Sequence, residues 1–172
     1  VVTGGSLAED EMAALMDLLL DGRMTAAQIG GLAVALRMKG ESVDELTGAA
    51  QALRRHMARV PGVPDGAVDT CGTGGDGAST LNVSTVAALV VAASGVPVAK
   101  HGNRAASGTV GGADVLDALG VTLALDPAVA SACLRETGFV FLFAPAFHPA
   151  LRHVAAARRE LGVRTFFNLL GP

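Results

Sequence analysis

The chain has 172 residues, 51% hydrophobic and 17% charged, with a formal net charge of −3 at pH 7. An acidic chain with only 3% aromatic residues lacks the basic surface and the stacking platforms that are typical of nucleic-acid-binding proteins. The longest apolar stretch, residues 86–99, contains Ser94, Gly95 and Pro97 and is too short for a membrane span. No basic segment precedes an apolar one at the start, so we expect no signal peptide and a cytoplasmic location.

Three segments of the first sixty residues predict helices, because each begins with a capping-box pattern. The segments are residues 6–22, 25–40 and 42–60, and the boxes begin at Ser6, Thr25 and Ser42. Within the first segment the apolar residues recur at helical spacing and form one stripe: Met12, Leu15, Met16, Leu19 and Leu20. The turn-rich segment 61–66 then predicts a domain boundary.

After residue 66 predicted strands alternate with predicted helices, which indicates a parallel sheet that is covered on both faces. The strands are expected at 67–71, 96–100, 121–125 and 139–143, and the helices at 84–94, 112–119, 127–138 and 149–161. We therefore expect an α/β protein with a small helical domain at 1–65 and a mostly parallel α/β domain at 66–172. Four strands are few for such a sheet, so we expect a fragment that is incomplete at its C-terminus.

A glycine-rich loop, CGTGGDG at residues 71–77, follows the first predicted strand. Glycines let backbone N–H groups approach an anion closely, and the hydroxyl-rich start of the next helix adds free N–H groups and its positive dipole end. A dinucleotide would require an acidic residue about 20 positions further on, where this chain has Lys100 and His101 instead. The loop also lacks the Gly-Lys-Ser/Thr ending of a P-loop. The sequence therefore predicts a site for another phosphorylated ligand.

A second polar cluster, KHGNR at residues 100–104, directly follows a predicted strand. Ligands of open α/β folds bind at the carboxyl ends of parallel strands, so this cluster and the glycine loop are expected at one edge of the sheet. The cysteines Cys71 and Cys133 match no metal-ligand spacing and are interpreted as small buried thiols in a reducing compartment.

Together these segments resemble the anthranilate phosphoribosyltransferase family of tryptophan biosynthesis. The segments that carry the resemblance are DTCGTGGDG (69–77), NVST (82–85), KHGNR (100–104), ADVLDALG (113–120) and the stretch from FAPAFHPALRHV to RRELGVRTFFNLLGP (143–172). The resemblance implies a nucleoside phosphorylase/phosphoribosyltransferase-like fold, about twice this length, that is homodimeric through its helical domain. It implies transfer of a phosphoribosyl group from phosphoribosyl pyrophosphate (PRPP), with Mg²⁺, to the amine of anthranilate.

The resemblance also implies which residues bind the substrates. The PRPP site would comprise Gly72, Thr73, Gly74, Gly75, Asp76, Thr80, Asn82, Ser84, Thr85, Lys100 and Ser107, with Ser84 also near Mg²⁺. The anthranilate site would comprise Gly72, His101, Asn103, His148, Arg158 and Pro172, with Arg158 gripping the carboxylate. No general base is assigned, because an aromatic amine is already a nucleophile. In the family, Mg²⁺ is coordinated largely by an acidic pair that lies beyond this sequence. The 172 residues alone are therefore expected to be inactive.

The loop after Arg104 departs from the family pattern, because Gly108 and Gly112 stand where serine is common. Three alternatives remain open: a relative with another amine acceptor, a pyrimidine nucleoside phosphorylase, and a non-catalytic relative that binds nucleic acid. A phosphorylase would be expected to have Lys-His-Ser where this chain has Lys100, His101 and Gly102. The acidic balance disfavours nucleic acid.

Overall fold

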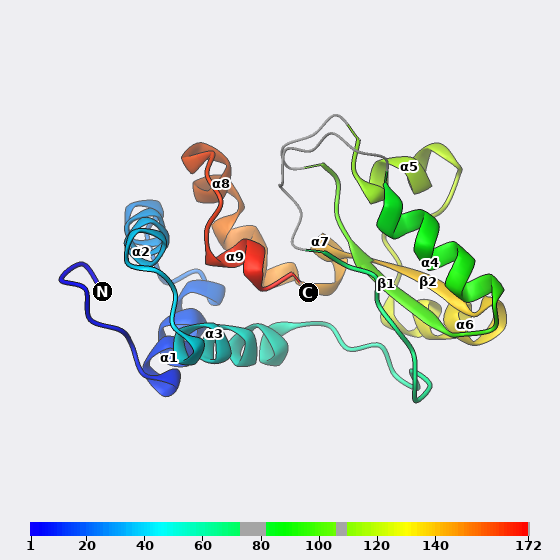
Figure 1. The fold of residues 1–172 in the computed structure, drawn as a ribbon, viewed down its shortest axis with the longest axis horizontal. Coiled ribbons are helices and arrows are strands. Elements are labelled where there is room, and N and C mark those ends of the chain that lie inside the picture. Colours follow the sequence, from blue (N-terminus) through cyan, green and yellow to red (C-terminus); the bar gives the residue numbers. More distant parts are fainter. Residues whose placement is uncertain (73–81, 106–109, 172) are drawn as a thin grey trace. The chain divides into compact units, whose positions relative to one another are not determined.

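The computed structural model describes residues 1–72, 82–105 and 110–171 (Figure 1). The chain divides into two compact units, unit 1 (Val1–Met57 and His148–Pro172) and unit 2 (Ala58–Phe147). This division differs from the expected domains at 1–65 and 66–172, because residues 148–172 belong to the helical unit. The reason is packing: Val154, Ala157, Phe166 and Phe167 are buried in one cluster with apolar residues of the first helices.

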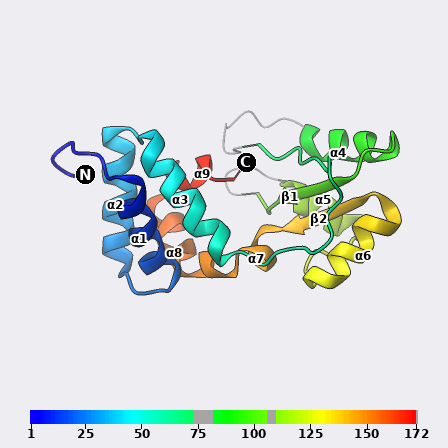
Figure 2. The same cartoon turned by 90° about the horizontal axis from the view of Figure 1, so that it is seen from below.

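Unit 1 is helical throughout its described regular elements: α1 (Glu9–Leu20), α2 (Ala26–Lys39), α3 (Val43–His56), the 3₁₀ turn η1 (Pro149–Leu151), α8 (Arg152–Leu161) and α9 (Phe166–Leu169). Figure 2 shows the three early helices grouped with the two late ones. The predicted stripe of α1 is confirmed at Met12, Met16, Leu19 and Leu20, all of which are buried. Helix α8 packs beside the turn after α1, where a Cβ on Gly22 would lie 2.6 Å from the His153 ring.

Two of the three predicted capping boxes are confirmed. The hydroxyls of Thr25 and Ser42 each accept a hydrogen bond from the N–H group three residues further on, at 3.2 Å. The box at Ser6 is wrong, because α1 begins after it and the Ser6 hydroxyl instead accepts a hydrogen bond from Lys39 Nζ at 3.1 Å. Helix α3 ends at His56, before the expected position near residue 60.

Unit 2 alternates helices and parallel strands as predicted. Its elements are α4 (Val83–Ala93), β1 (Val98–Gly102), α5 (Gly112–Ala118), α6 (Pro127–Thr137), β2 (Phe139–Phe143) and α7 (Ala144–Phe147). Strands β1 and β2 pair in parallel, with Val98 opposite Phe139. Figure 2 shows α4 on one side of this two-stranded sheet and α6 on the other.

Successive residues of β2 point to opposite faces and form two small cores. Val140 is buried against Ala130 and Leu134 of α6. Phe141 is buried in another cluster, with Ala113 and Leu116 of α5. The continuous apolar run that predicted a strand covered on both faces is therefore confirmed.

Four details of the predicted elements are corrected. The expected strand at 67–71 is reduced to a single parallel bridge between Val68 and Val98. Strand β1 occupies 98–102 rather than 96–100, and the helix expected at 149–161 is divided between η1 and α8. Residues 121–125 form no strand. Leu123 is their only buried side chain, and the Val121 N–H donates a hydrogen bond to the Leu116 carbonyl of α5 at 2.9 Å instead of to a neighbouring strand. No helix among the described residues is long and apolar enough to cross a membrane.

Candidate functional site

The segment before the glycine loop lies beside β1 and runs in the same direction. Val68 N–H donates to the Pro97 carbonyl at 3.0 Å, and Ala99 N–H donates to the Val68 carbonyl at 3.0 Å. This pairing brings residues 69–72 to the carboxyl end of β1, where His101 N–H donates to Asp69 Oδ1 at 3.2 Å. The predicted meeting of the two polar segments at one sheet edge is therefore observed for their described residues.

Lys100 is the buried cation of this edge. Its side chain comes from β1, the residue is 3% exposed, and Nζ lies 5.8 Å from the centroid of the Phe141 ring. Nζ donates to the His101 carbonyl at 3.2 Å. Among the described residues, none of the ion pairs involves Lys100. Because burying an ammonium without a counter-charge is costly, the position suits an anionic ligand.

The first turn of α4 provides hydroxyl groups near the same edge, since α4 packs on β1. The Thr70 hydroxyl donates to the Ser84 carbonyl at 2.7 Å and so ties the start of α4 to the segment before the glycine loop. Thr85 is buried, and its Oγ1 has no hydrogen-bond partner within the described part of the chain. Asn82 is the N-cap, and its side-chain amide donates to the Val110 carbonyl at 3.4 Å. After the buried lysine, a buried hydroxyl that can still form a hydrogen bond is a second feature expected of a site for a polar ligand.

Gly112 has a packing reason that the sequence comparison with the family pattern did not reveal. A Cβ at this position would lie 2.8 Å from Thr85 Oγ1. Glycine therefore lets α5 begin directly against the hydroxyl of α4, whereas a serine would require the Thr85 side chain or the start of α5 to shift. The departure from the family at Gly112 is thus accommodated by the local structure.

His101 and Cys71 lie together at the end of β1. Cys71 Sγ is 3.5 Å from His101 Nδ1, and the backbone N–H of Cys71 donates to Asp69 Oδ1 at 2.9 Å. Burial lowers the pKa of His101, helped by Lys100 and opposed by Asp69, so the ring is neutral at pH 7. Burial, with the charge of Asp69, raises the pKa of the Cys71 thiol. Asp69 and Cys71 were not predicted as site residues, because only the pairing of Val68 with Val98 brings them to the histidine.

The turn after His101 is fixed by charge pairs. The guanidinium of Arg104 contacts Asp114 at 2.8 Å and Asp117 at 2.7 Å, and these hydrogen bonds, that to Asp117 foremost, raise the pKa of Arg104. Asp114 also accepts hydrogen bonds from the backbone N–H groups of Ala105 and Gly111, which lower its pKa. These contacts fasten residues 104–105 to the start of α5 and leave Asn103 exposed beside His101.

Two predicted site residues, Arg158 and His148, belong to unit 1 and are described apart from Lys100 and His101. The Arg158 guanidinium lies 5.1 Å from the centroid of the Phe167 ring, and burial lowers its pKa. None of the ion pairs of the described residues involves this arginine. A partly buried, stacked guanidinium without a carboxylate partner suits a planar carboxylate ligand. His148 precedes the 3₁₀ turn η1.

Several predicted site residues lie outside the described residues: Thr73, Gly74, Gly75, Asp76, Thr80, Ser107 and Pro172. Gly72 is described and lies exposed at the start of the loop. The predictions for the seven residues therefore remain predictions.

The described residues do not complete a magnesium site. Mg²⁺ requires oxygen ligands in an octahedron. The only group of three potential metal ligands in the described part of the chain is Asp69, Cys71 and His101, which offers one oxygen, one sulfur and one nitrogen. Ser84, the predicted neighbour of Mg²⁺, is the second residue of α4, and its carbonyl accepts a hydrogen bond from the Thr70 hydroxyl. The fit to Mg²⁺ is poor, and these residues support no chemical step through that ion.

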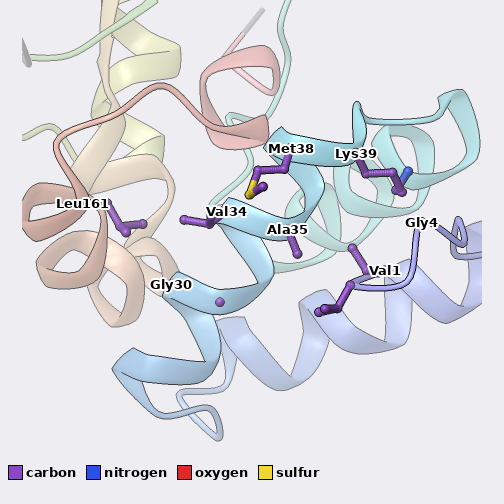
Figure 3. A pocket seen from close by; sticks show the side chains of 10 residues that line it. Val1, Gly4, Gly30, Val34, Ala35, Met38, Lys39 and Leu161 are labelled. Carbon is purple, nitrogen blue, oxygen red and sulfur yellow. The ribbon is translucent and has the colours of Figure 1, made fainter.

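Unit 1 has an apolar pocket of about 610 Å³ on the exposed side of α2, with Val1 and Leu161 on either side of the helix (Figure 3). The pocket is lined by Val1, Val2, Gly4, Gly30, Gly31, Val34, Ala35, Met38, Lys39 and Leu161. Its only charged side chain, Lys39, donates to Glu45 Oε2 at 2.9 Å and to the Gly40 carbonyl at 2.7 Å. None of the predicted substrate-binding residues lines this pocket, and its lysine charge is already balanced.

Two family models match this chain: the helical bundle domain of a glycosyl transferase family over residues 1–57, and the α/β domain of that family over residues 64–172. The relatives include anthranilate phosphoribosyltransferases of Afipia carboxidovorans, 56% identical over 98% of this chain and 50% of the relative, and of Methylobacterium radiotolerans, 59% identical over 99% and 50%.

Solved structures of proteins with the same name also resemble this chain. The anthranilate phosphoribosyltransferase of Thermus thermophilus is 49% identical with a TM-score of 0.94, and the match covers 99% of this chain and 52% of that protein. The enzyme of Saccharomyces cerevisiae, in complex with PRPP and Mg, is 30% identical with a TM-score of 0.86. This match covers 96% of this chain and 50% of that protein. The chain thus spans about half the length of the relatives it matches. Because the two family models match both its helical and its α/β part, the chain belongs to the glycosyl transferase family that these two domains define.

Proposed function

We propose that the protein to which this chain belongs transfers the phosphoribosyl group of PRPP to the amine of anthranilate. In this reaction the bond between ribose C1 and the pyrophosphate oxygen breaks, and a bond between C1 and the amine nitrogen forms. Pyrophosphate leaves with the bonding electrons, and the amine loses a proton to solvent. The similarity to relatives named anthranilate phosphoribosyltransferase, at 52–59% identity, supports the proposal.

The observation that carries the proposal is the buried ammonium of Lys100. It lies in the middle of β1, next to His101, without a carboxylate partner among the described residues. Helix α4, which begins with Ser84 and Thr85 in its first turn, packs on β1, and Gly72 opens the glycine loop. A pyrophosphate or phosphate oxygen bound here would neutralise the lysine and accept hydrogen bonds from hydroxyl and backbone N–H groups.

The proposed mechanism depends on electrostatics and positioning. As the C1–oxygen bond breaks, positive charge develops on the sugar and negative charge on pyrophosphate. Lys100 would stabilise the departing anion as a fixed charge that water does not screen. His101, neutral at pH 7, and Asn103 would orient the acceptor amine toward C1, and Arg158 would hold the acceptor carboxylate. No residue needs to act as a strong base, because the amine is nucleophilic once the sugar carries positive charge.

The cofactor, assembly and location are further parts of the proposal. A solved relative from Saccharomyces cerevisiae was obtained with PRPP and Mg, and another with 4-fluoroanthranilate. We propose that Mg²⁺ is bound mainly by the donor and by residues outside this chain, because the described residues lack an oxygen-ligand set. A homodimer formed through the helical domain and a cytoplasmic location follow from the family resemblance alone.

The test follows anthranilate fluorescence over time in the protein expressed from its complete gene, with PRPP and Mg²⁺ present. This chain contains no Trp or Tyr, so it adds little background. We expect a loss of signal that requires both PRPP and Mg²⁺. Arg158→Ala is expected to lower kcat/KM for anthranilate about 100-fold, because a charged, bidentate contact is lost. Arg159→Ala, the exposed neighbour on α8, is the matched control and should leave kcat/KM unchanged.

The outcomes separate the parts of the proposal. No loss of signal, with PRPP still bound in calorimetry, would show that the donor site is correct and the acceptor is another amine. Absence of PRPP binding would reject the proposed function. Equal effects of the Arg158 and Arg159 substitutions would remove Arg158 from the acceptor site.

A further inference from the structure

A cluster of three different metal-ligating side chains lies where the segment before the glycine loop meets β1. Asp69, Cys71 and His101 each offer one ligand atom, and these atoms lie within 4.8 Å of one another. Two of the residues come from the segment after Val68 and the third from β1, so the parallel pairing of Val68 with Val98 assembles the cluster.

The spacing within the cluster matches a tetrahedral metal. Cys71 Sγ and His101 Nδ1 are 3.5 Å apart. Two ligand atoms on a tetrahedral zinc, with bonds of about 2.3 Å to sulfur and about 2.0 Å to nitrogen, are separated by about 3.5 Å. The distance between the sulfur and the nitrogen is therefore the one that a shared zinc ion requires, and the aspartate oxygen lies within 4.8 Å of both atoms.

The aspartate is held in a way that leaves an oxygen for a metal. Asp69 Oδ1 accepts hydrogen bonds from the backbone N–H groups of Cys71 and His101, at 2.9 and 3.2 Å. No hydrogen bond within the described residues uses Oδ2. The two backbone contacts orient the carboxylate, and such support around a ligand strengthens metal binding.

The ligand set selects the class of metal. A thiolate, an imidazole nitrogen and one carboxylate favour Zn²⁺ and similar borderline ions, whereas Mg²⁺ prefers oxygen ligands. Thiolate and carboxylate together balance the two charges of the ion. The nearby ammonium of Lys100 opposes a cation, so we expect weaker binding than in a structural site with four protein ligands.

We propose that Asp69, Cys71 and His101 form a binding site for Zn²⁺, distinct from any Mg²⁺ site, with three protein ligands and one open position for water. The interpretation of Cys71 and Cys133 as small buried thiols is wrong about their burial, because both are only partly buried. Cys133, which lies on α6 and contacts the Phe139 carbonyl at 3.4 Å, has no share in the site and is the matched control.

The test uses Co²⁺ as a coloured probe for Zn²⁺. The chain is titrated with Co²⁺ under reducing conditions in excess Mg²⁺, and its absorption is recorded. We expect one equivalent of Co²⁺ to produce the charge-transfer absorption of a thiolate ligand and the intense visible bands of a tetrahedral ion. Addition of Zn²⁺ should abolish both signals. The Cys133→Ser variant should behave like the unmodified chain.

Substitution of the ligands decides the assignment. Cys71→Ser should remove the charge-transfer absorption and lower the affinity for Co²⁺ by at least about tenfold. Asp69→Asn keeps an oxygen for the two backbone contacts, so it should fold normally and yet bind Co²⁺ more weakly. A chain without charge-transfer absorption, or a Cys71→Ser variant that retains it, would overturn the proposal. Should Cys71→Ser fail to fold, unchanged Co²⁺ affinity in Asp69→Asn would overturn it instead. The readout is metal binding alone, so it does not depend on the proposed transferase activity.

Discussion

The chain has two lysines, Lys39 in unit 1 and Lys100 in unit 2, and their surroundings differ. Lys39 Nζ contacts Glu45 Oε2 at 2.9 Å, the Ser6 hydroxyl at 3.1 Å and the Gly40 carbonyl at 2.7 Å. The Lys39 and Glu45 side chains are 9% and 1% exposed. Lys100 is also buried, but its only hydrogen bond among the described residues goes to the His101 carbonyl.

This difference separates a structural charge from a charge that awaits a ligand. Around Lys39 the protein itself supplies the counter-ion and the remaining hydrogen-bond acceptors, so the folded state is stabilised without any other molecule. Around Lys100 the described residues supply no counter-ion, so its burial is a cost that a bound anion would offset. The two lysines should therefore respond in opposite ways to the same substitution.

The largest effect is expected from Lys39→Met. The substitution leaves the buried carboxylate of Glu45 without its partner, and we expect the free energy of unfolding to fall by about 3 kcal/mol. PRPP affinity should stay unchanged in the protein that remains folded. Denaturant unfolding and calorimetry measure the two quantities. A Lys39→Met variant as stable as the parent would show that the ion pair has no structural role.

Lys100→Met should have the opposite pattern. We expect PRPP affinity to fall about 30-fold, or roughly 2 kcal/mol, because a charge-assisted contact to the donor is lost. The free energy of unfolding should be unchanged or higher, because methionine fills a similar volume without a buried charge. Loss of stability together with full PRPP affinity would contradict the assignment of Lys100 to the donor site.

Acid provides a third test of the Lys39 region. Burial alone would raise the pKa of Glu45, but hydrogen bonds from backbone N–H groups of Ser42 and Leu7 and from Lys39 lower it from 4.5 to about 2. A group with a lowered pKa stabilises the fold above its unfolded value and loses that contribution as the pH falls. We expect unfolding free energy to drop by about 1–2 kcal/mol between pH 5 and pH 3, allowing for solvent screening.

The control for this pH dependence is Glu45→Gln, which should lack the decrease in unfolding free energy that Glu45 causes between pH 5 and pH 3. Glu160→Gln, at an exposed position of α8, should keep it. Identical pH profiles for the two variants would show that another group causes the acid sensitivity.

The smallest effect is expected from Arg104→Met. Arg104 lies four positions after Lys100, but its charge is paired with Asp114 and Asp117 in exposed contacts. Such contacts contribute little and are screened by salt. We expect a slight loss of stability that added salt reduces, and no direct loss of PRPP affinity. A loss of affinity as large as that of Lys100→Met would place Arg104 in the donor site.

Much of the fold was predictable because local chemistry determines it. Thr25 and Ser42 cap their helices as the capping boxes predicted, and the apolar run 139–143 is a buried parallel strand. The box at Ser6 failed because a distant residue, Lys39, bonds the hydroxyl. The strand expected at 121–125 failed because a strand requires a partner, and a sequence pattern does not show whether one is present.

The site was predictable only where chain order fixes position. That His101 and the segment before the glycine loop meet at one sheet edge follows from the rule for parallel strands. Three contacts depend on tertiary packing and were not predictable: Cys71 beside His101, the Arg158 guanidinium over the Phe167 ring, and Gly112 against the Thr85 hydroxyl.

The composition of unit 1 from two distant stretches of chain has a consequence for the order of folding. Helices α1 and α3 contact each other and can pair once the first 56 residues have left the ribosome. Their shared core also contains Val154, Phe166 and Phe167, which are synthesised only after all of unit 2. Closing so long a loop costs entropy and slows folding. During synthesis the early helices therefore expose apolar surface until residues 148–171 have been made and can pack against them.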